Sequence, residues 1–157
     1  MKGSALVRIG FLVPALVLIA TLATSAQAQP ASSLIEITNP WVRPPTGSRG
    51  LATAYFTIFN KSHEEDHLIR VETSASERAV VQRMRIRNMH ATYETVPRLR
   101  IDAVDRLKLR PGEYQVTLER LINPLRVGQD ILLTLTFERA GRIEVNAQVT
   151  KRMLFNR

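Results

Sequence analysis

Five consecutive residues, His63-Glu64-Glu65-Asp66-His67, fit the pattern H-E-x-x-H. In zinc proteases this pattern lies on a helix, which places both histidines on one face as metal ligands and uses the glutamate as general base. Here the motif lies between a turn at residues 60–62 and a strand expected from Leu68 to Thr73, and three of its residues are consecutive acids. We therefore interpret it as a solvated acidic loop, with an adventitious divalent-metal site as the alternative.

The segment from Val80 to His90 carries an arginine at every second position, Arg83, Arg85 and Arg87. A strand here would display the three guanidinium groups along one face, because successive side chains point to opposite faces. Like charges this close are unfavourable unless they are solvated or paired. One interpretation is a solvated outer face that keeps a sheet edge from pairing with other chains. The other is a docking surface for an acidic partner or a phosphate-bearing ligand, since arginine forks suit both groups.

A turn followed by a strand is expected between Arg110 and Leu121. Pro111-Gly112 supplies the turn, and the residues after it alternate in type. On such a strand Gln115 and Thr117 lie side by side on one face. The stretch therefore predicts a strand that displays a pair of polar side chains.

Alternation with a period of two residues, typical of β-strands, recurs along the chain. Expected strands include residues 34–38, 52–59, 68–73, 131–137 and 143–149, and a hairpin turn at residues 139–142 joins the last two. In the second of these, Ala52, Ala54, Phe56 and Ile58 alternate with Thr53, Tyr55, Thr57 and Phe59. No segment offers ten residues of convincing helical periodicity. Many short strands separated by turn signals predict an all-β sandwich or barrel.

Six segments, in order and with a family's spacing, cover nearly all of the chain after residue 28. They are Asn39-Pro40-Trp41-Val42-Arg43, residues 50–56 (Gly-Leu-Ala-Thr-Ala-Tyr-Phe) with Asn60, Asp66-His67-Leu68, Leu109-Arg110-Pro111-Gly112, Asn123-Pro124-Leu125 with Gly128, and residues 133–138 (Leu-Thr-Leu-Thr-Phe-Glu). Together they resemble the periplasmic copper chaperones of the PCu(A)C type. The resemblance implies a single cupredoxin-like, Greek-key β-sandwich domain and a role in copper delivery to respiratory oxidases.

The resemblance also implies metal ligands in the pattern His-x10-Met-x21-His-x-Met, with the last two on the strand after the Pro-Gly turn. The corresponding positions of this chain hold Gln82, Tyr93, Gln115 and Thr117. Cu(I) is a soft ion that favours thioether sulfur and imidazole nitrogen, whereas an amide, a phenol and a hydroxyl are hard, weak, neutral donors. We predict that this divergent member keeps the scaffold with a degenerate copper site, and we expect no cofactor.

The alternative is copper(I) bound at a relocated site built from Met84, Met89 and His90, which carry the right donor types. Against it, Met84 shares the expected inward alternation of Ile86 and can equally fill the core, and His90 can be an ordinary loop residue. Five further basic residues are expected to extend the positive charge across the end of the molecule where the family carries its metal, which would repel a cation. They are Arg98, Arg100, Arg106, Lys108 and Arg110.

Residues 1–28 have the order of a secretory signal peptide. Two basic residues precede an apolar run from Ile9 to Ala23, and Ala26-Gln27-Ala28 follows as an Ala-x-Ala cleavage site. A membrane anchor is the alternative, but the run is shorter than the ~20 residues that a span needs. We expect cleavage after Ala28, export to the periplasm, and a mature domain of residues 29–157 without a transmembrane segment. The chain has no cysteine, which argues against a lipid-anchored form and leaves no disulfide.

Removing residues 1–28 takes away two of the 22 Lys and Arg and none of the 14 acidic residues, so the formal charge falls from +8 to +6. A basic exported domain suits acidic partners, whereas export and the lack of a recognition helix disfavour nucleic acid. No nucleophile motif or phosphate-binding loop occurs, so we predict no enzyme and no catalytic residue. The favoured function is a metal-independent binding or assembly module that contacts a periplasmic protein partner through Arg83, Arg85 and Arg87. A Cu(I) metallochaperone with the relocated site is the alternative, and the oligomeric state stays open.

Overall fold

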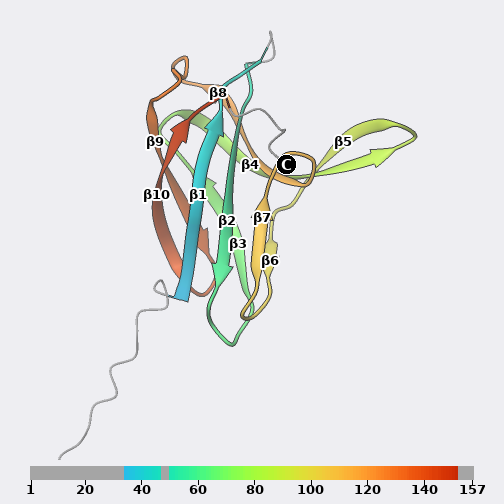
Figure 1. Cartoon of the computed structure of the whole chain (residues 1–157), viewed down its shortest axis with the longest axis vertical. Coiled ribbons are helices and arrows are strands. Elements are labelled where there is room, and N and C mark those ends of the chain that lie inside the picture. The colour runs from blue at the N-terminus through green and yellow to red at the C-terminus, as the bar shows by residue number, and fades with distance from the viewer. Residues whose placement is uncertain (1–33, 47–49, 152–157) are drawn as a thin grey trace, which may run out of the picture.

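The chain folds as an all-β sandwich, as predicted (Figure 1). A computed structural model describes residues 34–46 and 50–151, and the predicted signal peptide at residues 1–28 lies outside these ranges. The strands within them are β1 Ile35–Arg43, β2 Ala52–Asn60, β3 Asp66–Glu72, β4 Ser76–Arg87, β5 His90–Thr95, β6 Leu99–Ile101, β7 Arg106–Leu109, β8 Tyr114–Leu121, β9 Asp130–Phe137 and β10 Gly141–Val149. None of the described residues forms a helix with the length and apolar content that a bilayer crossing requires.

All the strands in the described ranges join one hydrogen-bonded sheet, in the order β5-β4-β8-β7-β2-β1-β10-β9-β3-β6. The first and last strands in the sequence, β1 and β10, are parallel neighbours, with Trp41 beside Gln148 and Val42 beside Val149. Long connections that bring non-consecutive strands together are typical of Greek-key sandwiches. The strands of the described residues all lie between residues 35 and 149, within the predicted mature domain of residues 29–157.

The core forms where alternate residues of facing strands meet. In β9, Ile131, Leu133 and Leu135 are buried, while Leu132 between them is exposed. In β2, Phe56 and Ile58 are buried beside the small Ala52 and Ala54. Burying one large aliphatic or aromatic side chain stabilises a fold by about 1.5 to 3 kcal/mol, so the period-two pattern holds the sandwich without a disulfide.

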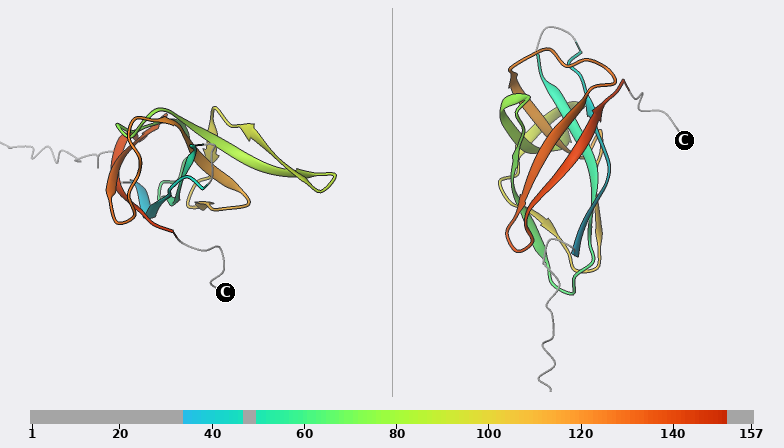
Figure 2. Two further views of the ribbon diagram at one scale, coloured as in Figure 1. Left: turned by 90° about the horizontal axis from the view of Figure 1, so that it is seen from above. Right: turned by 90° about the vertical axis from the view of Figure 1, so that its left-hand side faces the viewer.

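The hairpin of β4 and β5 leaves the body of the sandwich and projects sideways, as Figure 2 shows from above. β4 pairs with β8 up to Arg83, and the Met84 amide still donates to the Glu113 carbonyl at 2.7 Å, whereas residues 85–87 pair with β5. All six residues of β5 are exposed, and Ile86 is 70% exposed. The predicted inward alternation of Ile86 is therefore wrong, because this part of the strand has no second layer to face.

Candidate functional site: a polar depression at one end of the sandwich

The four positions that correspond to the family's metal ligands line one depression of about 430 Å³. Gln82 of β4 lies directly opposite Gln115 of β8 in the antiparallel register. Thr117 lies two residues along β8 on the same face, and Tyr93 of β5 contributes the outer wall. The predicted pairing of Gln115 and Thr117 is confirmed, since the amide nitrogen of Gln115 donates to the Thr117 hydroxyl at 3.2 Å.

A continuous chain of hydrogen bonds runs through this depression. The Arg43 guanidinium donates to the Tyr55 hydroxyl, and that hydroxyl donates to Oε1 of Gln115 at 3.3 Å. After the Gln115 to Thr117 bond, the Thr117 hydroxyl donates to Oε1 of Gln82 at 2.6 Å. Buried polar groups need such partners, and the described residues leave no buried side-chain nitrogen or oxygen unpaired.

Arg43 and Tyr55 belong to this site, although the sequence did not single them out. Tyr55 is fully buried, with the Trp41 ring at 4.6 Å and the Arg43 guanidinium 5.2 Å from its ring centroid. The signal that could have found them is their position in the segments that carry the resemblance. A bulge between Thr38 and Trp41 then sets the register that places Arg43 beside Thr53.

The predicted Pro-Gly turn precedes β8 and fixes where that strand starts. Gly112 has φ of +93°, a conformation open to glycine and typical of a type II turn, and the Glu113 amide donates to the Arg110 carbonyl at 3.1 Å. An Arg110–Glu113 ion pair closes the turn, and the hydrogen bond from Arg110 lowers the pKa of the Glu113 carboxyl. Met84 lies over this turn, with its terminal carbon 3.9 Å from the position that a Cβ on residue 112 would take.

The soft donors of the proposed relocated site are spread along the hairpin. Met84 pairs with Tyr93, three register positions before the Arg87–His90 pair that closes the hairpin, which is about 10 Å along the strand. Met89 is at the tip, 92% exposed, and Nδ1 of His90 lies 2.8 Å from the Asn88 carbonyl oxygen. The three donors therefore do not converge in this conformation.

The three alternating arginines lie on the opposite face of the hairpin from Met84 and Tyr93. Arg83 covers the Tyr114 ring, with its guanidinium carbon 5.3 Å from the ring centroid. Arg85 and Arg87 share one acid, Glu94, at 3.2 Å and 3.7 Å. One acid shared by two of the three arginines leaves the face with a net positive charge.

Positive charge does not extend across this end of the molecule as predicted. Arg106 pairs with Phe59 in the sheet register, whereas Thr53 of the same strand lines the depression. Phe59 and Thr53 are six residues apart on β2, which is about 20 Å along the strand. Arg98 and Arg100 also lie far away, where they form ion pairs with Glu138 and with Glu65 and Asp102. The prediction is wrong for Arg98 and Arg100 because β6 pairs with β3 and not with β5. It is wrong for Arg106 because β7 pairs with the far end of β2.

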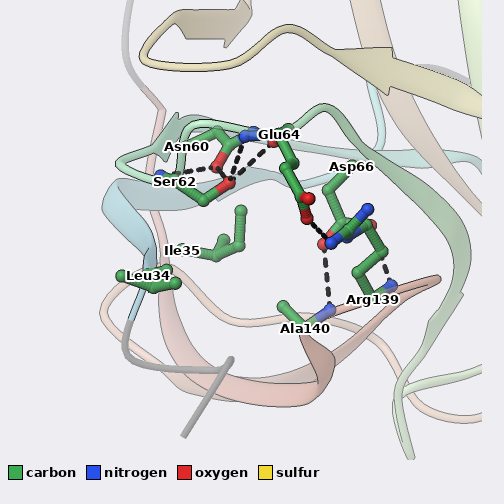
Figure 3. A pocket seen from close by; sticks show the side chains of 8 residues that line it. All are labelled: Leu34, Ile35, Asn60, Ser62, Glu64, Asp66, Arg139 and Ala140. Carbon is green, nitrogen blue, oxygen red and sulfur yellow. Dashed lines mark hydrogen bonds and ion pairs between the residues drawn. The ribbon is translucent and has the colours of Figure 1, made fainter. Parts of the chain in front are cut away.

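The H-E-x-x-H residues lie at that opposite end, beside the small pocket drawn in Figure 3. They form no helix, and the described residues contain no group of three or more His, Cys, Asp or Glu that could hold a metal ion. Glu64 and Glu65 are exposed, as expected for an acidic loop. Asp66 and His67 are buried and open β3, so for these two residues the solvated-loop interpretation is wrong.

Asp66 has a structural role there. Its Oδ1 accepts the amides of His67 at 2.7 Å and Arg139 at 2.9 Å, and its Oδ2 accepts the amide of Ala140 at 2.9 Å. The carboxylate thereby ties the start of β3 to the β9–β10 turn, and Figure 3 shows it beside Ala140. An ion pair between Glu64 and Arg139 closes the same turn from outside.

Residues 35–149 match a family model described as "Putative lipoprotein LpqE-like". The chain belongs to the LpqE-like family. No curated protein matches the sequence.

Solved structures similar to this LpqE-like chain are PCuAC domains and related copper proteins. The copper-bound PCuAC domain from PmoF2 is 26% identical, with a TM-score of 0.63, and the match covers 76% of this chain and 94% of that domain. CuI-DR1885 from Deinococcus radiodurans is 26% identical, with a TM-score of 0.62, over 83% of this chain and 85% of that one. The predicted resemblance to the PCu(A)C family and the cupredoxin-like fold are confirmed.

Proposed function

We propose that this chain is an exported, metal-independent binding or assembly module built on the PCuAC scaffold. The observation that supports the proposal is the hydrogen-bond chain in the depression, where three of the four ligand positions, Gln82, Gln115 and Thr117, bond to one another. Thr117 is bonded to both glutamines, and Gln115 is bonded to Tyr55. A metal ion would have to break these bonds in exchange for neutral oxygen donors, which Cu(I) disfavours.

Charge supports the same conclusion. Arg43 lines the depression and brings a permanent positive charge to it. A cation entering the depression would meet this repulsion, and the carboxylate in the lining, Glu119, already pairs with Arg78 at 3.5 Å. The site therefore suits a neutral or negatively charged ligand.

The projecting β4–β5 hairpin is the proposed contact for a protein partner. One face carries Arg83, Arg85 and Arg87, and the tip carries Met89 at φ of +63°. The second position of a two-residue hairpin loop usually holds glycine, because a residue with a side chain loses about 1 to 2 kcal/mol of stability in the left-handed backbone conformation. A large apolar side chain kept in such a conformation and 92% exposed fits a role in contacting another molecule.

The copper question is tested by anaerobic Cu(I) titration of residues 29–157 in competition with a chromophoric Cu(I) chelator. We expect the wild type to take no Cu(I) from the chelator, because its depression lacks soft donors. A Met84→Ala, Met89→Ala, His90→Ala variant is the matched control and should behave identically. Uptake of a single equivalent by the wild type would overturn the proposal, and loss of that uptake in the variant would place the metal at the hairpin.

A Cu(I) metallochaperone is the second candidate, because the chain is similar to a copper-bound PCuAC domain and to CuI-DR1885 over most of its length. Under this alternative, copper binds through Met84, Met89 and His90 after the hairpin rearranges. The titration above separates the two candidates.

Binding to immobilised polyglutamate tests the basic face of the hairpin. Replacing Arg83, Arg85 and Arg87 by Gln is expected to weaken binding at low salt about tenfold, since each exposed charge pair contributes up to about 1 kcal/mol. The control variant replaces three basic residues away from the hairpin, Arg126, Arg142 and Lys151, and so removes the same charge. Equal weakening in both variants would mean that net charge, and no particular surface, governs the interaction.

A further inference from the structure

We propose that the depression binds an organic carboxylate, such as a small carboxylic acid or the C-terminus of a peptide. This inference deepens the proposed function and rests on it, since it names the ligand class of the same site. It follows from the direction of the hydrogen-bond chain, from the partners of Arg43 and from the charges on the rim.

The direction of the chain is fixed at its first member. A guanidinium only donates hydrogen bonds, so the Tyr55 hydroxyl that accepts from Arg43 turns its own proton to Oε1 of Gln115. The Gln115 amide nitrogen then donates to Thr117, whose proton goes to Oε1 of Gln82. Each acceptor along the chain receives one hydrogen bond, and the chain ends in the amide NH₂ of Gln82. Both ends of the chain therefore present N–H donors at the depression.

Arg43 differs from most arginines of the sheet in its partners. Arg85, Arg98, Arg100 and Arg110 each contact a carboxylate, whereas Arg43 bonds to two hydroxyls, those of Thr53 and Tyr55. Within residues 34–46 and 50–151, no carboxylate lies within ion-pair distance of Arg43. A guanidinium has five N–H donors, and the two hydroxyls leave several of them for a ligand. A half-buried cation with neutral partners favours an incoming anion, and a carboxylate matches its planar fork.

The rest of the lining selects among anions. Pro44, Leu51 and the Tyr93 ring supply apolar surface, which suits the organic part of a carboxylic acid better than an inorganic anion. Glu119 also lines the depression, and Arg78 offsets its charge only from 3.5 Å. This carboxylate repels an anionic ligand, and the repulsion is about twice as large for a phosphate dianion, so a monoanion is favoured.

The test is an NMR titration of ¹⁵N-labelled residues 29–157, with the side-chain signals of Gln82, Gln115 and Arg43 as the readout. The probes are N-acetylalanine and its amide, propionate as a small carboxylate without a peptide group, and inorganic phosphate. We expect saturable shifts of all three side chains with N-acetylalanine and none with its amide. Propionate binding as tightly as N-acetylalanine would identify a small acid as the source, whereas tighter binding of N-acetylalanine would identify a peptide end.

Two variants and one control locate the binding. Arg43→Met and Gln82→Leu each remove donors at one end of the chain and should weaken N-acetylalanine binding at least about tenfold, because each loses a hydrogen bond to a charged group. Arg142→Met removes an exposed arginine at the far end of β10 and should change nothing. If Arg43→Met lowers the melting temperature, the Gln82→Leu result is the one that tests carboxylate binding, because this variant keeps the contact between Arg43 and the buried Tyr55.

Binding of the amide as tightly as the acid, preference for phosphate, or the absence of saturable shifts would each overturn the carboxylate assignment. None of these results would restore a copper role, which depends on the Cu(I) titration alone. Conversely, Cu(I) uptake by the wild type would overturn the metal-independent function even if a carboxylate also binds.

Discussion

A variant carrying Gln82→His, Tyr93→Met, Gln115→His and Thr117→Met is expected to bind a single Cu(I) that the wild type does not bind. The backbone already holds these positions around one depression, with Gln82 directly opposite Gln115 in the register. Only the donor types are missing. Supplying two imidazoles and two thioethers should raise Cu(I) affinity at least about a thousandfold, because even outer-shell partners of metal sites are worth about 10- to 100-fold each.

The measurement is the same chelator competition, with X-ray absorption to count sulfur and nitrogen neighbours of the metal. A control variant with Asn at positions 82 and 115 and Leu at positions 93 and 117 disrupts the same hydrogen-bond chain without adding a soft donor. It should bind no copper. If the four-fold variant keeps the wild-type fold and still takes no Cu(I), the four positions do not correspond to the family's ligands, and the proposal of a degenerate site fails.

A further Arg43→Met substitution in the four-fold variant examines the charge argument. Removing the guanidinium from the rim of the depression is expected to raise Cu(I) affinity again, because the metal no longer meets a cation. The same substitution is expected to weaken carboxylate binding in the wild-type background. One residue thus shifts the depression between cation and anion ligands in opposite directions.

Periodicity predicted the sheet because one face of each strand is buried. The alternation in residues 131–137 and 143–149 specifies both strands and their hairpin, since a one-residue slip would expose Leu133 and Leu135. The short strand β6 was missed, because three residues carry too little pattern. Alternation also tells which face a residue occupies but not which end of the molecule it reaches, so Arg98 and Arg106 were placed at the wrong end.

The candidate site could be predicted only in part. The spacing of Gln82, Tyr93, Gln115 and Thr117 came from the resemblance, and the structure brings the four together. The pattern could not indicate a role for Tyr55, because alternation placed its side chain on the face opposite the core. In the structure the Tyr55 side chain is also buried on this face of β2, beneath the depression. Its role depends on a bulge in β1 and on partners 12 and 60 residues away. Such long-range contacts leave no periodic trace in the sequence.

Asp66→Ala is expected to destabilise the domain by about 3 to 5 kcal/mol, the largest stability loss from a single polar substitution that we predict. Asp66 is 3% exposed and accepts three backbone amides, two of them from the β9–β10 turn. Alanine leaves all three N–H groups without their acceptor in a buried place. Since total stability of a domain is about 5 to 15 kcal/mol, the variant should lie close to the unfolding threshold.

Urea denaturation of residues 29–157 measures this loss, and two comparisons separate its causes. Asp66→Asn keeps one acceptor oxygen and replaces the other by an NH₂ group that faces a backbone donor, so we expect an intermediate loss of about 2 kcal/mol. Asp105→Ala removes an exposed carboxylate on the same end and should cost no more than about 0.5 kcal/mol. A loss below 1 kcal/mol in Asp66→Ala would contradict the bonding described here. This end is about 20 Å from the depression along β2. The Asp66→Asn molecules that remain folded should therefore bind the carboxylate as tightly as the wild type. Unchanged affinity would show that Asp66 stabilises the fold and does not bind the ligand.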